Sequence, residues 1–204
     1  MEITGIEDFK SGRYKIHIDN EFAFVLYKGE LHKYGIKEGN TISEEVYDEI
    51  VGEVLVKRAK LRAMNLLTKR DYTTGKLREK LREGLYPPSV IEKAIEYVTG
   101  FHYLDDYRYA YTFLSDHCND KTLMRMKSDL AAKGIKKDVF EKALLDWQDN
   151  GGFVDEDAMI QNILRKRGYM AKKGDEKEYR RIYGLLMRNG FSADSINRNL
   201  KLNR

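Results

Sequence analysis

The chain has 204 residues, of which 42% are hydrophobic and 34% charged, with two prolines and one cysteine. This composition predicts a helix-rich protein with a buried core, and a single cysteine excludes an internal disulfide. The longest uninterrupted apolar run, 22–27, is far shorter than the roughly 20 residues that cross a bilayer. No signal peptide precedes this run, so we expect a cytoplasmic protein with no membrane partner.

The formal net charge of +4 hides an asymmetry along the chain. Residues 1–56 carry 12 acidic and 6 basic side chains, whereas residues 57–204 carry 21 acidic and 31 basic ones. Within the basic part, the segment 57–82 holds ten cations against only Asp71 and Glu79. Such a segment projects a positive field, which favours an anionic partner over the alternative of a solvated helix surface.

The first 56 residues are predicted to form a small β meander followed by a helix. Residues 13–18 alternate in the manner of a strand, Asp19-Asn20 indicates a turn, and the run 22–27 returns antiparallel. A turn at 28–30 is expected to lead into a short third strand at 31–34. Ser43, followed by two glutamates, is typical of a helix N-terminus.

The rest of the chain repeats one helical pattern three times. An apolar stripe with offsets 0, 3, 4 and 7 begins at Ala63, Ala110 and Ile160. A three-helix unit has little apolar surface of its own, so such units bury their open sides against neighbours. We therefore predict a mainly α protein in which tandem three-helix repeats form an elongated array. The predicted domains are the β-rich module 1–56 and three repeats at 57–104, 105–154 and 155–204.

The second and third helices of the copies share one register. Fourteen residues separate Leu81 from Ile95, Leu130 from Leu144, and Leu186 from Leu200. Gly134 and Gly190 stand where a helix C-terminus favours a left-handed residue, whereas Gly84 falls one place early. The third copy has a longer connection around 168–178, which we interpret as a solvated linker, with a charged contact as the alternative.

Two acidic pairs lie at the junctions between copies, at Asp105-Asp106 and Asp155-Glu156. Carboxylates at a helix N-terminus accept hydrogen bonds from free N–H groups, and this capping role is the favoured interpretation. The rival is a magnesium site in a metal-dependent nuclease, which needs further converging acids. The histidines show no metal spacing and no Gly-rich phosphate loop is present, so we expect neither an enzyme, nor a cofactor, nor a metal.

Three tyrosines, Tyr107, Tyr109 and Tyr111, lie close to Arg108 in the second copy. Stacking on single-stranded bases is one use for such side chains. Alternate positions on a helix face different sides, however, so a place in the core is favoured for at least one of them.

Several of these motifs together resemble the RecX family of bacterial recombination regulators. They are Leu104-Asp105-Asp106 with Arg108-Tyr109-Ala110, the run 126–130, and Lys133-Gly134-Ile135. The resemblance covers about residues 57–200. The acidic N-terminal module and the long third connection depart from it.

The resemblance implies a curved molecule of three tandem repeats that binds the RecA recombinase filament. It further implies that the protein inhibits ATP hydrolysis and strand exchange by the recombinase. These activities belong to recombination, DNA repair and the SOS response. The resemblance also implies binding to single-stranded DNA, with double-stranded DNA as a further candidate. We expect a monomer, and a stand-alone DNA-binding protein is the alternative function. The candidate residues for contact with the partner or DNA are Arg58, Arg62, Lys69, Arg70, Lys76, Lys80, Arg108, Arg125, Lys127, Arg165, Lys166, Lys172 and Lys173.

Overall fold

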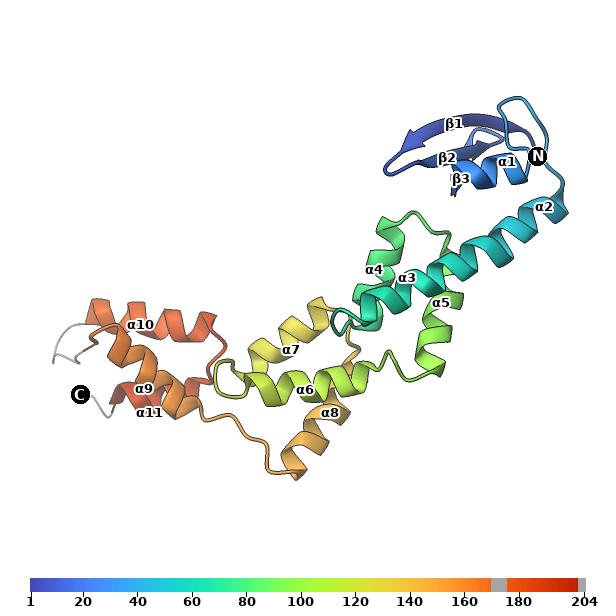
Figure 1. The fold of residues 1–204 in the computed structure, drawn as a ribbon. Coiled ribbons are helices and arrows are strands. Elements are labelled where there is room, and N and C mark those ends of the chain that lie inside the picture. The colour runs from blue at the N-terminus through green and yellow to red at the C-terminus, as the bar shows by residue number, and fades with distance from the viewer. Residues whose placement is uncertain (170–175, 202–204) are drawn as a thin grey trace. The chain divides into compact units, whose positions relative to one another are not determined.

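The structure is a computed structural model that describes residues 1–169 and 176–201. The chain divides into two compact units, Met1–Asp105 and Asp106–Arg204. The first unit opens with a three-stranded sheet and a short helix (Figure 1). These elements are β1 (Ile3–Phe9), β2 (Arg13–Ile18), β3 (Glu21–Tyr27) and α1 (Lys28–Lys33).

The sheet is antiparallel in the order β1-β2-β3. Two of its strands, β2 and β3, are as predicted, whereas the third differs. The turn at Asp19-Asn20 is confirmed, with both residues at positive φ. The predicted third strand at 31–34 is wrong, because the third strand is β1 and residues 28–33 form α1. The Glu30 carboxylate accepts a hydrogen bond of 2.7 Å from the Tyr27 N–H, which caps the first turn of this helix.

A continuous helix follows and links the sheet to the first repeat. It consists of α2 (Glu44–Glu49), the π-helical stretch η1 (Ile50–Leu55) and α3 (Val56–Leu67). Its start is as predicted, since the Ser43 hydroxyl accepts a hydrogen bond from the Val46 N–H. The helix runs through the boundary expected between residues 56 and 57.

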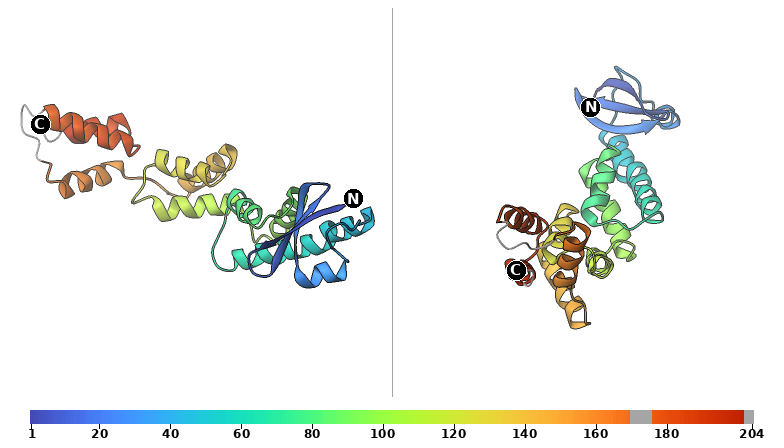
Figure 2. Two further views of the ribbon diagram at one scale, coloured as in Figure 1. Left: turned by 90° about the horizontal axis from the view of Figure 1, so that it is seen from above. Right: turned by 90° about the vertical axis from the view of Figure 1, so that its left-hand side faces the viewer.

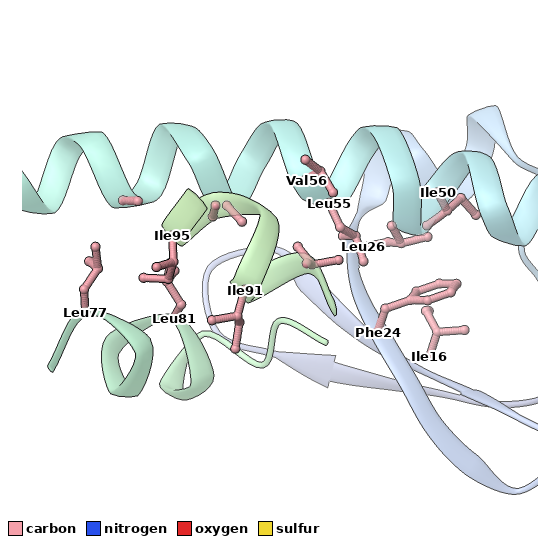
Figure 3. Packing of buried hydrophobic residues seen from close by; sticks show 14 of the residues in the cluster. Ile16, Phe24, Leu26, Ile50, Leu55, Val56, Leu77, Leu81, Ile91 and Ile95 are labelled. Atoms are coloured by element: carbon pink, nitrogen blue, oxygen red, sulfur yellow. The ribbon is translucent and has the colours of Figure 1, made fainter. Parts of the chain in front are cut away.

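One hydrophobic cluster joins the sheet to the first repeat. Ile16 and Phe24 of the sheet and Ile50 and Leu55 of η1 belong to the same buried cluster as Leu81 of the repeat (Figure 3). Burial of such side chains stabilises each by about 1.5–3 kcal/mol. Residues 1–56 therefore share their core with the first repeat and do not form a compact unit of their own.

The predicted three-helix repeats are confirmed as groups of neighbouring helices (Figures 1 and 2). The first group combines α3 with α4 (Thr74–Glu83) and α5 (Pro88–Gly100). The second comprises α6 (Asp106–His117), α7 (Leu123–Ala132) and α8 (Lys137–Asp149). The third comprises α9 (Glu156–Lys166), α10 (Glu176–Arg188) and α11 (Ala193–Lys201). Among the described residues, no helix has the length and apolar character that crossing a membrane requires.

The repeated apolar positions form the cores of these groups. The two stacked positions of each second helix are fully buried, as predicted, at Leu77 and Leu81, Met126 and Leu130, and Ile182 and Leu186. Of the equivalent positions in the third helices, Ile95 and Leu200 are buried but Leu144 is only half-buried. Ala143 and Trp147 are the buried residues of α8 near this position.

The second helices end in the predicted left-handed residue. Gly134 and Gly190 have φ values of 86° and 83°. In the first repeat Gly84 does stand one place early, and Leu85 adopts the left-handed conformation at φ 60°. The following residue closes the helix end in each case, as in the Ile135 N–H bond of 3.0 Å to the Leu130 carbonyl.

Polar side chains connect α9 to α11 in the third group. The Arg198 guanidinium donates two hydrogen bonds to the Asp157 carboxylate, at 3.0 and 2.9 Å. Asn199 donates a third, and the Ser192 hydroxyl donates to Glu156 at 2.7 Å. Carboxylates at the start of α9 are therefore bound by two residues of α11 and by Ser192, which immediately precedes it.

The longer connection of the third repeat lies between α9 and α10. Its last residues, Lys177 and Glu178, belong to the first turn of α10 and not to the loop. Lys172 and Lys173 lie outside the described residues.

Replacement of Gly134 by alanine is expected to lower the free energy of unfolding by about 1–2 kcal/mol, because a Cβ is strained in the left-handed region. Urea unfolding followed by the fluorescence of Trp147 and by circular dichroism measures this change. Gly184→Ala is the control, since Gly184 lies within α10 and an added Cβ meets only the end of Arg188 there. This control should raise the stability by about 0.5–1 kcal/mol. Equal effects of the two variants would contradict the assigned backbone.

Stability should also depend on pH through Asp157. Hydrogen bonds from Arg198 lower the pKa of Asp157 below its ordinary value. A carboxyl group whose pKa is lowered by folding stabilises the protein above its unfolded pKa, and this contribution is lost as pH falls through the folded pKa. Wild-type protein should therefore lose more stability to urea between neutral and acidic pH than Asp157→Asn does. The same loss in both proteins would show that the Asp157 pair contributes nothing.

Candidate functional site

Helix α3 and the turn after it carry exposed cations outside the buried stripe of the helix. Val56, Ala59, Ala63 and Leu66 are buried, so residues between them point outward. Arg62 of α3 and Lys69, in the turn just after this helix, are both exposed. Neither has a carboxylate partner within the part of the chain that the structure describes. Their charges are thus free to act on a partner.

Arg58, predicted for the same surface, is instead bound within the first unit. Its guanidinium donates a 2.9 Å hydrogen bond to the Val25 carbonyl, pairs with Glu30 and lies 4.7 Å from the centre of the Tyr27 ring. Only 18% of the side chain is exposed. This arrangement indicates that Arg58 holds α3 against β3 and α1, a role that its charge alone did not reveal.

Arg13 of β2, which the sequence did not mark as a candidate, acts electrostatically on Tyr86 together with Arg62. Burial raises the pKa of Tyr86, and the charges of Arg58, Arg13 and Arg62 oppose that rise. Arginines from β2 and α3 therefore lie close enough to act on one phenol. No local sequence pattern connects residues 13 and 62, so only the fold brings them together.

The predicted cations of α4 are paired with acids of the same helix. Lys76 lies 2.8 Å from Glu79, and Lys80 lies 2.7 Å from Glu83. The hydrogen bond from Lys76 lowers the pKa of Glu79. Such exposed pairs contribute only about 0–1 kcal/mol, so an incoming phosphate is able to replace the carboxylate. Arg70 follows α3 and lies 4.6 Å from the ring centre of Tyr72.

The second unit carries its own, more scattered group of predicted cations. Arg108 on α6 and Lys166 on α9 are exposed. Arg125 of α7 pairs with Asp129 at 3.3 Å, and Lys127 lies 5.7 Å from the ring centre of Phe140. Arg165 donates to the Asn162 side chain. Within this unit the structure therefore distributes the candidates over three helices and gives several of them local partners.

The acidic junction residues act as helix-starting residues. The Asp155 carboxylate accepts a 2.9 Å hydrogen bond from the Ala158 N–H, which confirms the capping interpretation at this junction. Asp105 immediately precedes α6, and Asp106 is its first residue. Among residues 1–169 and 176–201, no group of three or more metal-ligating side chains converges.

The three tyrosines of α6 are half-buried and pack against the core of the second repeat, as predicted. The Tyr107 hydroxyl donates a 2.6 Å hydrogen bond to Asp146. Tyr109 stacks on Phe113. These contacts engage the tyrosines within their own repeat.

A separate aromatic feature lies at the end of α5. Tyr97, Phe101 and Tyr103 form a row of rings, and the Lys60 ammonium lies 4.6 Å from the centre of the Tyr97 ring. The signal in the sequence was the spacing of Tyr97 and Phe101, which lie four residues apart but off the buried stripe of α5. Charge runs in the sequence do not distinguish either aromatic residue, nor Lys60 beside them.

Three comparisons with known proteins agree with this architecture. A family model described as RecX, first three-helix domain, matches residues 59–97, within the α3–α5 group. The regulatory protein RecX of Clostridium acetobutylicum is 28% identical over 195 residues, which cover 94% of this chain and 90% of that protein. The regulatory protein RecX of Clostridioides difficile is 29% identical over 201 residues, with coverages of 96% and 92%.

Solved structures show the same fold. A crystal structure of a regulatory protein RecX matches with a TM-score of 0.60 at 22% identity and covers 98% of both chains. The crystal structure of RecX from Lactobacillus salivarius matches 73% of this chain with a TM-score of 0.57. The sequence and fold comparisons together show that the chain is similar to RecX proteins over nearly its whole length, which confirms the resemblance seen in its motifs.

Proposed function

We propose that this protein is a non-enzymatic regulator that binds a RecA recombinase filament on DNA and inhibits its ATPase and strand-exchange activities. The relatives that match nearly its whole length are named regulatory proteins. Asp155 at one acidic junction caps a helix, and no cluster of metal-ligating side chains occurs among the described residues. The proposal therefore assigns the function to a surface.

The observation that carries the proposal is the unpaired positive charge of Arg62 on α3 and of Lys69 in the turn just after this helix. A recombinase filament on DNA presents phosphates, and each phosphate that a protein cation neutralises releases condensed counterions. The α3 backbone is held by a buried stripe, so binding does not have to order it. Arg13 adds a third cation from the sheet, near Tyr86.

Cations on the second unit extend this mode of binding. Arg108 and Lys166 are exposed on helices of two different repeats. Contacts made by modules of one chain reinforce one another, because the first contact raises the effective concentration of the next. Many weak contacts to a periodic filament thus add up to strong binding.

The proposed function is tested by ATP hydrolysis of a RecA recombinase on single-stranded DNA. Wild-type protein should inhibit hydrolysis at low salt and inhibit it less as salt rises, because counterion release weakens with added salt. The double variant Arg62→Gln with Lys69→Gln should need several-fold more protein for the same inhibition.

The matched control carries Lys10→Gln and Lys37→Gln, which remove the same charge from exposed positions of the N-terminal region. It should inhibit like wild type. No inhibition by stoichiometric wild-type protein would refute the proposed function. Equal weakening by both double variants would refute the role of α3, because the inhibition would then depend only on the net charge of the protein.

A stand-alone DNA-binding protein is the second candidate, favoured by the same exposed cations. It differs in requiring no recombinase. Strong binding to bare DNA, without any effect on recombinase ATPase activity, would select this second candidate.

A further inference from the structure

Three aromatic side chains form an exposed row on the first unit. The ring centres of Tyr97 and Phe101 are 4.9 Å apart, and those of Phe101 and Tyr103 are 6.1 Å apart. The planes of Phe101 and Tyr103 differ by only 19°. Phe101 is 57% exposed and Tyr103 is 52% exposed. Two large, nearly parallel rings therefore face solvent.

The core of the repeat does not use these two rings. Helix α5 buries Val90, Ile91, Ala94, Ile95 and Val98, all of which precede Phe101 and Tyr103. Leu104 follows Tyr103 and is buried, so the chain has an apolar anchor at the next position already. Removal of the exposed ring of Phe101 or Tyr103 should thus leave the fold intact, which makes these residues suitable for a test of binding.

A cleft of about 340 Å³ opens beside the row, between η1, α3 and α5. Leu61, Met64 and Tyr97 supply its apolar wall, and Leu61 is 59% exposed. Gly52 also lines it, and a Cβ built on Gly52 meets no atom within 4 Å. Gly100, just before Phe101, is likewise open to solvent, although it does not line the cleft. The cleft and the exposed rings are therefore both accessible to a ligand.

The charges beside the cleft favour an anionic ligand. Lys57 and Lys60 line it, against the single carboxylate of Glu53 among the lining residues. Lys60 already lies over the Tyr97 ring, which places an ammonium group at one end of the aromatic row. Helix α3 itself contains no acidic residue. A ligand with flat apolar groups and regularly spaced negative charges matches this arrangement.

We infer that Phe101 and Tyr103 form a stacking platform for the bases of single-stranded nucleic acid, with Lys57 and Lys60 contacting its phosphates. The inference rests on the proposed function and names a direct DNA contact within it. Aromatic rings beside cations bind single strands without sequence preference, because every base has a flat face. Duplex bases are stacked on one another, so this site should favour single strands.

The test measures fluorescence anisotropy of a labelled oligothymidylate at low salt, without recombinase. The double variant Phe101→Ala with Tyr103→Ala should bind about 5-fold or more weakly, which is the lower end expected for one lost stacked base. Phe101→Trp should bind with the affinity of wild type. The oligonucleotide should quench the tryptophan fluorescence of this variant more than that of wild type, because the only tryptophan of wild type, Trp147, is buried.

Phe22→Ala is the matched control, because Phe22 is an exposed phenylalanine on the sheet of the same unit. It should leave oligothymidylate binding unchanged. The pair Lys57→Gln with Lys60→Gln should weaken binding and reduce its dependence on salt, since fewer counterions are released. Circular dichroism of each variant checks that the helices remain.

Unchanged oligothymidylate affinity in the Phe101 and Tyr103 variant would overturn the inference, as would equal loss in Phe22→Ala. If that variant loses inhibition of the recombinase but keeps oligothymidylate affinity, the rings contact protein, and the inference fails while the proposed function stands. If oligothymidylate affinity falls and inhibition persists, the stacking platform is supported and inhibition depends on other contacts.

Discussion

The structure of the first unit depends on the burial of one side of the continuous helix from Glu44 to Leu67. Its apolar residues contact the sheet at one end and α4 and α5 at the other, so that sheet and repeat share one core (Figure 3). Because that side is committed to packing, the remaining sides of α3 are left for charge. Arg58 completes the attachment to β3, whereas Arg62 and Lys69 remain free for a partner.

The repeat pattern made most of the helical fold predictable. A spacing of fourteen residues marks the core positions because each copy packs the same helices against one another, and the left-handed glycines mark where the second helices end. The repeat pattern could not predict the third strand of the sheet, β1, because this strand lies outside the repeats. Residues 31–34 were predicted to be a strand, but the Glu30 cap begins a helix there, and β1 takes the place beside β2, with a register shift between Ile3 and Gly5. Pairing between distant segments leaves little local trace.

The candidate surface was predictable in sign but not in detail. Counting charges reveals an excess of cations, but it does not show that Arg58 is paired with Glu30 or that Lys76 is paired with Glu79. Arg13 reaches the neighbourhood of Arg62 only through the sheet. The aromatic row has a weak sequence signal, because an aromatic residue off the buried stripe is recognisable only once the stripe has been assigned to a helix.

The central claim is that the exposed side of α3 contacts the nucleoprotein filament. Site-specific photo-crosslinking tests it directly, with the crosslinking side chain placed in turn at positions 62, 69 and 37. We expect adducts with the recombinase or its DNA from positions 62 and 69, and none from position 37. Adducts from position 37 alone would contradict it.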